Sequence, residues 1–301
     1  MIQPISTSTV SLRERVETFF EILQNEICQR IEEIDGKGRF HEDLWTHVEH
    51  GGGRTRVLER GAVFEKAGVN TSSVGGALPE SLARHLSTDT QGYAAAGISL
   101  VFHPDSPMVP TVHMNFRYIE LERGDAWFGG GADLTPYYPY REDVEHFHRV
   151  LKGACDRHDS TYYPKFKHWC DEYFFLKHRN EARGIGGIFF DYLRGNAEKL
   201  FAFVQDAGRA FLPAYVPIVE RRRREPWGKR EKEFQLIRRG RYAEFNLVYD
   251  RGTLFGLETK GRIESILISL PPQVKWRYGY QPEPGSREAE LQQFLKPRDW
   301  A

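Results

Sequence analysis

The sequence predicts an α+β fold whose strands pair antiparallel. In the last third, short strand-like segments at 242–249, 254–259 and 264–270 are separated by the turn sequences Asp-Arg-Gly and Lys-Gly, which predicts a β-meander. Segments of helical periodicity stand in separate blocks instead of alternating with single strands, which argues against a doubly wound α/β fold. No internal repeat or low-complexity linker divides the chain, so we expect a single domain over 1–301, with residues 1–8 as a loose tail.

The N-terminal part is expected to start with a long helix. Ser11 and Glu14 form a capping-box pattern. Behind it, apolar residues recur at three- and four-residue spacing, which predicts an amphipathic helix that ends near Gly36. The glycine-rich stretch 51–56 predicts a loop, and residues 57–64 after it predict a strand.

The central part predicts two neighbouring strands joined by a rigid loop. Residues 94–103 form a mostly apolar run that is typical of a buried strand. Prolines lack an N–H group and fix φ, so the three prolines within 103–110 exclude a helix and predict an extended or turning loop. Residues 111–121 predict the next strand, and the glycine-rich stretch 129–136 predicts a loop.

Helices are predicted for most of the stretch that follows. Residues 141–155, 163–183 and 197–212 have helical patterns. A glycine-rich break at 184–187 ends the second helix and leads to the short apolar segment 188–192.

Composition favours a soluble protein of a reducing compartment. A hydrophobic content of 40% in 301 residues is enough for a sizeable core, and a net charge of zero provides no field that attracts nucleic acid or membranes. Three scattered cysteines form neither a disulfide framework nor a zinc knuckle. The apolar runs are far shorter than the roughly 20 residues that span a bilayer, and no signal peptide is evident. We therefore expect a cytoplasmic protein with no membrane span and no nucleic-acid partner.

Four consecutive arginines at 221–224 are the sharpest charge feature. They lack the interleaved aromatic residues that single-strand nucleic-acid binding uses. A solvated helix end or loop is therefore the favoured interpretation.

Polar side chains alternate along the strand predicted at 111–121. Because side chains two residues apart share a face of a strand, His113, Asn115 and Arg117 point one way, and the apolar side chains between them point the other way. An acid–base group, an amide and a fixed cation on one face indicate a binding site. The alternative is a polar, solvent-facing strand.

Common catalytic motifs are missing from the sequence. It has no Walker phosphate loop, no dinucleotide fingerprint, no H-E-x-x-H, no paired C-x-x-C and no G-x-S-x-G. Imidazoles can bind a divalent metal, but His103, His113, His148 and His178 are far apart in sequence, so hydrogen-bonded structural histidines are the favoured interpretation of their spacing.

Two further residues are candidates for ligand contacts. Asp133 follows three glycines and could accept hydrogen bonds from an N–H-bearing ligand, or it could stabilise an Asx-type turn. Arg262 at an expected hairpin tip could grip a carboxylate, or it could be an ordinary surface arginine. The residues alone thus indicate a soluble α+β enzyme for a carboxylate-rich ligand, without a nucleotide or a covalent nucleophile.

Five long strings of the sequence, in order, resemble the oxygen-dependent coproporphyrinogen III oxidase family over residues 16–300. They are "HPDSPMVPTVHMNFR", "WFGGGADLTPYYPY", "FKHWCDEYFFLKHRNEARGIGGIFFDYL", "GRYAEFNLVYDRGTLFGLETKGRIESILISLPP" and "FLKPRDW".

The resemblance implies an oxidative decarboxylation of coproporphyrinogen III. The propionates of rings A and B become vinyl groups, with dioxygen as co-substrate and carbon dioxide and hydrogen peroxide as by-products, and the product is protoporphyrinogen IX in haem biosynthesis. It implies no flavin, haem or nicotinamide, because the electron-rich pyrrole is itself the reductant.

The resemblance also implies roles for individual residues. His113 is the proton donor, and Asp133 holds the pyrrole N–H groups and acts as a base. The implied substrate contacts are Ser99, Asn115, Phe116, Arg117, Lys260, Gly261 and Arg262. The implied metal ligands are His103, His113, His148 and His178, for which manganese would suit mixed nitrogen and oxygen ligation; this role of His113 conflicts with its role as a free acid.

The implied fold is a large antiparallel β-sheet flanked by α-helices on both faces, assembled as a homodimer through residues 242–277. A strand edge exposed in that region would be covered by the partner. Two other classes of protein stay open. One is a tetrapyrrole carrier or sensor without catalysis; the presence of His113, Arg117 and Asp133 argues against it. The other is a metal-dependent hydrolase, which needs a clustered ligand set with an open position.

Overall fold

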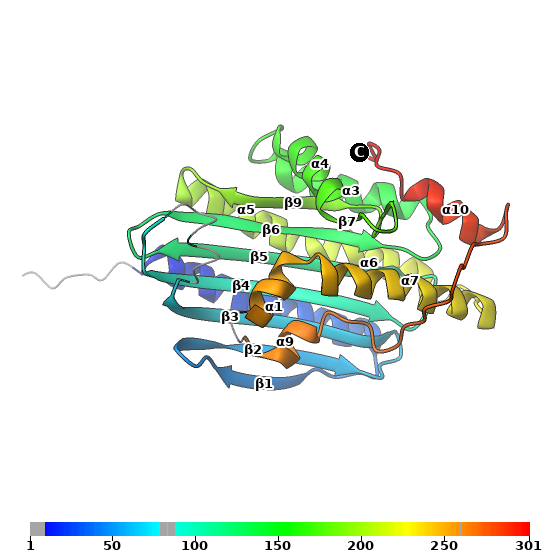
Figure 1. Cartoon of the computed structure of the whole chain (residues 1–301), viewed down its shortest axis with the longest axis horizontal. Helices are drawn as coiled ribbons and strands as arrows, with labels where there is room; N and C mark the ends of the chain where they lie inside the picture. The colour runs from blue at the N-terminus through cyan, green and yellow to red at the C-terminus, as the bar shows by residue number, and fades with distance from the viewer. Residues whose placement is uncertain (1–9, 79–82, 84–87, 259–260) are drawn as a thin grey trace, which may run out of the picture.

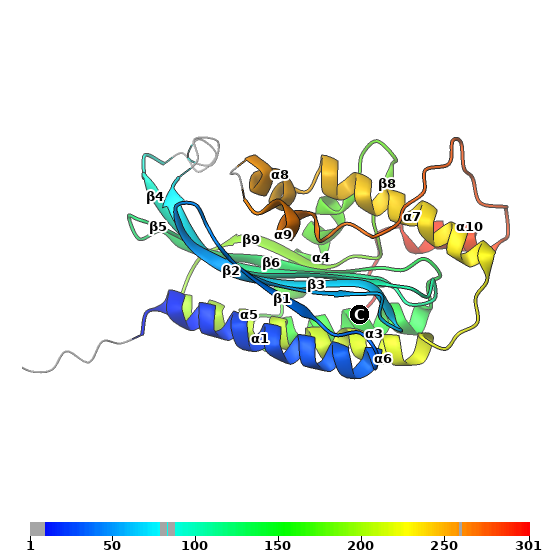
Figure 2. The ribbon, with the colours of Figure 1, turned by 90° about the horizontal axis from the view of Figure 1, so that it is seen from below.

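A computed structural model describes the chain except residues 1–9, 79–82, 84–87 and 259–260. One antiparallel sheet forms the middle layer, and helices lie on both of its faces (Figures 1 and 2). The α+β class and the antiparallel sheet between two helical layers are therefore confirmed. No described helix is long and apolar enough to cross a membrane.

The large sheet has seven strands in the order β1-β2-β3-β4-β5-β6-β9, and every neighbouring pair is antiparallel. Its strands are β1 (His41–Thr46), β2 (His50–Glu59), β3 (Phe64–Ala77), β4 (Gly92–Pro104), β5 (Thr111–Leu121), β6 (Ala126–Thr135) and β9 (Gly187–Leu193). Six strands follow each other along the chain, and β9 joins β6 after a helical excursion. The strands predicted at 94–103 and 111–121 are confirmed as β4 and β5.

The main hydrophobic core lies between one face of the sheet and four helices, α1 (Leu12–Asp35), α3 (Arg141–Asp156), α5 (Ala197–Arg209) and α6 (Phe211–Arg222) (Figure 2). Helix α1 has the predicted capping box, with reciprocal hydrogen bonds between Ser11 and Glu14, and ends at Gly36 in the left-handed conformation. Its apolar stripe is buried against the sheet, as the periodicity predicts.

The opposite face of the sheet is covered by a second helical layer, which contains α7 (Lys229–Val248), α8 (Arg251–Glu258) and α9 (Ile263–Leu267) (Figure 2). The short hairpin of β7 (Phe175–Leu176) and β8 (Glu181–Ala182) and the helix α10 (Arg287–Phe294) lie beside α7 (Figure 1). Helix α4 (Tyr162–Tyr173) packs along the edge strand β9.

The predicted β-meander at 242–270 is wrong: the described part of this stretch, 242–258 and 261–270, contains the end of α7 and the helices α8 and α9, while residues 259–260 lie outside the described residues. Short apolar runs fit a strand and a buried helix equally well, so their pattern does not decide between the two. The Asp-Arg-Gly sequence is a helix start: the Asp250 carboxylate accepts the N–H of Thr253 at 2.7 Å, as an N-cap residue does.

The two glycine-rich stretches predicted as loops are also strands. Residues 51–56 lie in β2, and 129–135 lie in β6. A Cβ atom at Gly53 would lie 2.3 Å from the Trp45 ring, and one at Gly130 would lie 2.5 Å from the Phe116 ring. These glycines therefore allow neighbouring groups to approach the strand closely, which is a use of glycine other than turn formation.

The helix predicted at 163–183 is only half correct. Helix α4 stops at Tyr173, and the rest forms the β7–β8 hairpin. The helix predicted at 197–212 is divided at Ala210 into α5 and α6. The helix predicted at 141–155 is confirmed as α3, and the segment 188–192 lies in β9.

Candidate active site

A cavity of about 350 Å³ lies between the sheet and the second helical layer. Its floor consists of residues from the middle strands β3, β4 and β5, and its cover comes from α7, α8 and α9. The main core fills the other face of the sheet, so this cavity is where the sheet can present polar side chains to a ligand.

The polar face predicted for β5 is confirmed. His113, Asn115 and Arg117 line the cavity, whereas the rings of Phe116 and Tyr118 are buried in the main core. Phe116, an expected substrate contact, also borders the cavity, although its ring packs against Phe190 in the main core.

A row of polar side chains crosses the cavity floor. Asn70 on β3 pairs in register with Ser99 on β4, and Ser99 pairs with Asn115 on β5. Side chains directly opposite each other in a sheet lie on the same face, and all three residues line the cavity. The sheet therefore places the predicted contact Ser99 between two amides.

His113 is oriented by two neighbours. Its Nδ1 lies 2.8 Å from Asp133 Oδ1, and its Nε2 lies 3.4 Å from Asn115 Nδ2. An ionised carboxylate only accepts hydrogen bonds, so Nδ1 carries a proton and donates it to Asp133. Nε2 is then the ring nitrogen that lacks a proton, and it lies next to Asn115 in the cavity lining.

Asp133 lies behind His113, outside the set of described residues that line the cavity. Both of its oxygens accept hydrogen bonds from the guanidinium of Arg183, at 2.9 and 2.8 Å. Burial opposes the charged carboxylate, but the charge of Arg183 and the hydrogen bonds from His113 and Arg183 hold the pKa of Asp133 below its ordinary value. Asp133 is thus a buried anion that holds His113 by a hydrogen bond, and its expected direct contact with pyrrole N–H groups stays a prediction.

Arg183 is a site residue that the sequence interpretation missed. Its guanidinium lies over the rings of Phe174, Tyr242 and Phe245, donates to Asn246 Oδ1 at 2.9 Å, and lines the cavity. The residue was placed at the end of a helix, so its contacts with α7 could not be anticipated. An arginine beside the glycine-rich break was the only signal in the sequence.

Arg117 is held from the side by an aspartate of the neighbouring part of the sheet. Its guanidinium lies 2.7 Å from Asp191 on β9, and Arg251 of α8 lies 3.6 Å from the same carboxylate. A Cβ atom at Gly129 would lie 2.6 Å from Asp191 and 2.9 Å from Arg117, so the glycine provides the space for this ion pair. Neither Asp191 nor Arg251 was predicted as a site residue.

The segment predicted as a hairpin tip reaches the cavity in another form. Gly261 and Arg262 line the cavity where the chain enters α9, and Arg262 forms an ion pair with Asp43 of β1. Lys260 lies outside the described residues. Arg262 is therefore near enough to contact a ligand, although it is not at the tip of a hairpin.

His103 is buried beside the cavity. Its Nε2 lies 2.9 Å from the Ser269 carbonyl oxygen and its Nδ1 lies 3.3 Å from the Thr111 hydroxyl. Burial and the positive charge of Arg239 hold the pKa of His103 well below its ordinary value, so the ring is neutral.

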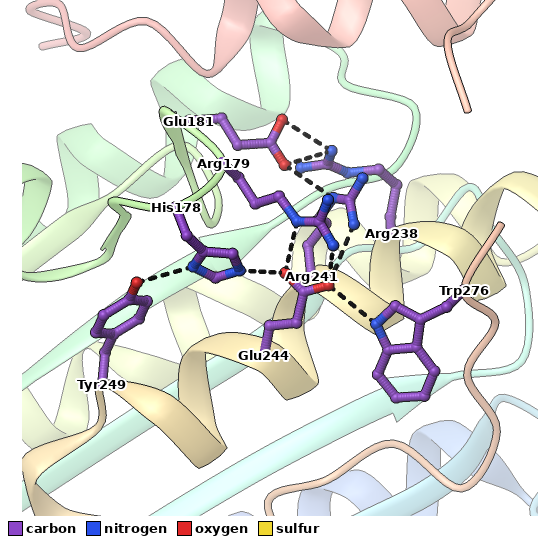
Figure 3. Close-up of polar contacts among 8 residues, drawn as sticks. All are labelled: His178, Arg179, Glu181, Arg238, Arg241, Glu244, Tyr249 and Trp276. Carbon is purple, nitrogen blue, oxygen red and sulfur yellow. Dashed lines mark hydrogen bonds and ion pairs between the residues drawn. The ribbon is translucent and has the colours of Figure 1, made fainter. Parts of the chain in front are cut away.

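The other two histidines lie elsewhere and have their own partners. His148 is buried on α3, with Tyr163 and the Ile185 carbonyl at 2.9 and 3.0 Å from its ring nitrogens. His178 contacts Glu244 at 2.7 Å and Tyr249 at 2.8 Å in the polar cluster of Figure 3.

The four histidines expected to bind one metal ion therefore do not fit a single metal centre. Among the described residues, no three His, Cys, Asp or Glu side chains are grouped so that they could hold a metal ion. For His103, His148 and His178, both ring nitrogens have protein partners. The interpretation as hydrogen-bonded structural histidines agrees with these contacts.

Three of the four consecutive arginines at 221–224 contact other parts of the fold. Arg221 and Arg222 form ion pairs with Asp143 of α3, and Arg223 donates to the Ile34 carbonyl oxygen at the end of α1. These contacts join helices, which explains the charge run without a nucleic-acid partner.

Several buried polar atoms of the cavity lining have no hydrogen-bond partner in the described part of the chain: Asn70 Oδ1, Arg183 Nε, Tyr242 OH and Arg262 Nε. A buried polar group without a partner costs about 1–3 kcal/mol, so each of these atoms needs a water molecule or a ligand group as its partner. Two of the atoms are cationic N–H donors and one is a pure acceptor. The site thus suits a ligand that carries both carboxylates and N–H groups.

A model of the family described as coproporphyrinogen III oxidase matches residues 15–300, which is nearly the whole chain. The chain belongs to the coproporphyrinogen III oxidase family, which makes it an oxidoreductase of porphyrin biosynthesis.

Proposed function

We propose that this member of the coproporphyrinogen III oxidase family uses dioxygen to convert coproporphyrinogen III to protoporphyrinogen IX. In each of rings A and B, the carboxylate of a propionate leaves as carbon dioxide and the side chain gives up one further hydrogen as a proton and two electrons, which leaves a vinyl group. One dioxygen takes up these two electrons, this proton and one more proton from the surroundings, and leaves as hydrogen peroxide. The observation that carries the proposal is the cavity floor, where His113 and Arg117 stand on one strand face beneath a cover that contains Arg262.

The cationic groups of the cavity are assigned to the carboxylates of the substrate. Arg117 and Arg262 can each form charge-assisted hydrogen bonds with a propionate, since both line the cavity and a planar guanidinium matches the geometry of a carboxylate. Ser99, Asn115 and the main chain of Gly261 complete the contacts, and Lys260 is assigned to them by its place in the family's motif.

His113 is assigned to proton exchange with the reacting pyrrole and its side chain. Asp133 fixes the tautomer through Nδ1 and stabilises the protonated ring, so Nε2 can accept a proton from the substrate and return it to reduced oxygen. Electrons for oxygen come from the electron-rich pyrrole, so the proposal requires no flavin, haem or nicotinamide.

We also propose that the protein acts as a cytoplasmic homodimer, with the single chain of 1–301 as one domain and the interface within 242–277. Exposed apolar side chains in this region support an interface: Leu247, Val248, Leu254, Leu257, Ile263 and Trp276 are each at least 38% exposed. They lie on α7, α8 and α9 and the segment after them, rather than on the strand edge that was expected.

The direct test uses metal-stripped protein and coproporphyrinogen III, with and without air, followed by chromatography of the oxidised porphyrins. Tri- and dicarboxylic products in air but not under nitrogen are expected. Binding of coproporphyrinogen without product under either atmosphere would favour a carrier. Product only after manganese is restored would show that a metal takes part despite the separation of the four histidines.

A further inference from the structure

The substrate proposed above has pyrrole N–H donors that need acceptors once they leave water. A buried donor without a partner costs free energy, so the cavity must supply an oxygen or a nitrogen lone pair. Asp133 was the expected acceptor, but its oxygens already accept from His113 and Arg183, and it lies behind the cavity wall.

Most other carboxylate and amide oxygens around the cavity are occupied too. Asn115 Oδ1 accepts from Arg117 at 3.2 Å. The Asp250 carboxylate accepts from the Tyr173 hydroxyl at 2.9 Å and from Thr253. Among the cavity residues, Asn70 Oδ1 is the buried amide oxygen that has no donor in the described part of the chain.

The amide of Asn70 is fixed in one orientation. Its Nδ2 donates to the Ser265 carbonyl oxygen of α9 at 2.8 Å. Rotating the amide by half a turn would place two oxygens against each other, so Oδ1 stays the end of the amide that has no donor among the described residues. Register with Ser99 places Asn70 on the same face as the side chains that contact the proposed substrate.

We propose that Asn70 Oδ1 accepts a hydrogen bond from a pyrrole N–H of the macrocycle and makes the site select the reduced, porphyrinogen form; this inference rests on the proposed function. A porphyrinogen has saturated bridges between its pyrroles, so its rings tilt and can present N–H groups to one side. A porphyrin with the same four carboxylates is planar and keeps its N–H groups inside the ring. An acceptor in the cavity floor therefore distinguishes the two forms, whereas the arginines do not.

The experiment measures binding of both forms to the full chain under nitrogen. Coproporphyrin III is titrated by its fluorescence, and coproporphyrinogen III is then titrated as the competitor that displaces it. In the Asn70→Leu variant, we expect the Kd for coproporphyrinogen to rise about tenfold, since a hydrogen bond to a buried group is lost, and the Kd for coproporphyrin to change less than about twofold.

Two further variants separate recognition from architecture. Asn70→Asp keeps an acceptor oxygen but loses the donation to Ser265, so it should preserve the preference for the reduced ligand. Ser73→Ala, which removes a hydroxyl that donates to Glu17 of α1 on the opposite face of β3, should change neither Kd.

Equal weakening of both ligands in Asn70→Leu would overturn the inference, because it would show that Asn70 only supports α9. Unchanged Kd values for both ligands in Asn70→Leu would overturn it as well, and so would loss of the preference for coproporphyrinogen over coproporphyrin in Asn70→Asp. If the wild-type chain binds neither ligand and forms no product in air, the proposed function itself fails. If the wild type converts coproporphyrinogen III but the ratio of the two Kd values is unchanged in Asn70→Leu, only the role of Asn70 is wrong.

Discussion

At the scale of residues, the ion pair between Asp133 and Arg183 sets the surroundings of His113, for which we propose a role in proton exchange. Both partners are almost fully buried, and both Asp133 oxygens face the guanidinium. Burying two charges is costly unless they are paired and hydrogen-bonded, and this pair meets both conditions. Its consequence is that the pKa of the Asp133 carboxyl, which accepts from Nδ1 of His113, is held below its ordinary value.

The variant Asp133→Asn tests this assignment. The asparagine keeps the size of the side chain but no longer stabilises a protonated His113, so we expect kcat to fall by roughly 10²-fold or more while KM changes little. Steady-state turnover of coproporphyrinogen III in air provides both constants. Near-normal kcat would remove Asp133 from the mechanism.

The variant Gly129→Ala tests how Arg117 is positioned. The added methyl group would meet the Asp191–Arg117 ion pair at under 3 Å, so the guanidinium must shift. We expect a rise in KM of about tenfold, which is about 1.4 kcal/mol of substrate binding. The control is Gly153→Ala on α3, where a Cβ atom meets nothing within 4 Å; KM should stay at the wild-type value there, and an equal rise would show a nonspecific effect of glycine substitution.

Whether the position of a site residue could be predicted depends on how far along the chain its contact partners lie. The alternation of His113, Asn115 and Arg117 follows from the two-residue period of a strand, so their shared face was predictable from local sequence. Arg183 reaches Asp133 across 50 residues of chain and Asn246 across 63, and no local pattern encodes such contacts. Asp191 escaped prediction for the same reason.

At the scale of elements, helix α8 forms part of the cover of the cavity through Gly252, Thr253 and Gly256. Asp250 fixes its start: the carboxylate accepts from the N–H and the hydroxyl of Thr253 and also from the hydroxyl of Tyr173 on α4. One side chain thus caps the helix and ties it to α4 beside the edge strand β9. The same aspartate led the sequence interpretation to a turn between strands, because Asp and Gly are common in both settings.

The variant Asp250→Ala tests this link. We expect a loss of about 1 kcal/mol in the free energy of unfolding, as for other N-cap residues, together with lower turnover because the cover of the site is displaced. The matched control is Ser286→Ala, which removes the N-cap hydrogen bond of α10 to Ala289, away from the cavity. Chemical denaturation and turnover are measured on both variants; equal turnover in both would contradict the role of Asp250 in the cover.

At the scale of the whole molecule, the fold class was predictable although several of its strands were misplaced. Long alternating or apolar segments such as β4 and β5 show their period clearly. The glycine-rich parts of β2 and β6 were predicted as loops, because glycines that allow close packing look like turn glycines in the sequence. The second helical layer was predicted as strands, because short apolar runs do not distinguish a helix from a strand. The cavity arises from the packing of this layer on the sheet, so it could not be located before the layer was known.

The two buried histidines should make the whole fold sensitive to mild acid. Burial and the charge of Lys167 lower the pKa of His148 from 6.5 to about 3, and the pKa of His103 is lowered in the same direction. Below pH 6.5 these two histidines bind protons in the unfolded chain but not in the folded chain, so the free energy of unfolding must fall as the pH falls. Each such histidine contributes about 1.4 kcal/mol per pH unit once the pH is well below 6.5.

Lowered carboxylate pKa values act in the same direction but at lower pH. Glu244 and Glu288 have pKa values of about 2 instead of 4.5, because hydrogen bonds outweigh the effect of burial, so their contribution is lost only below about pH 4.5. The window between pH 6.5 and about 5 therefore reports on the histidines. We expect urea unfolding in this window to show a smaller pH slope in His148→Gln than in the wild type, and an unchanged slope in His168→Gln, whose imidazole is 76% exposed on α4. The same slope in wild type and His148→Gln would mean that the His148 proton is not excluded by folding, and the neutral, hydrogen-bonded assignment of this ring would then be wrong.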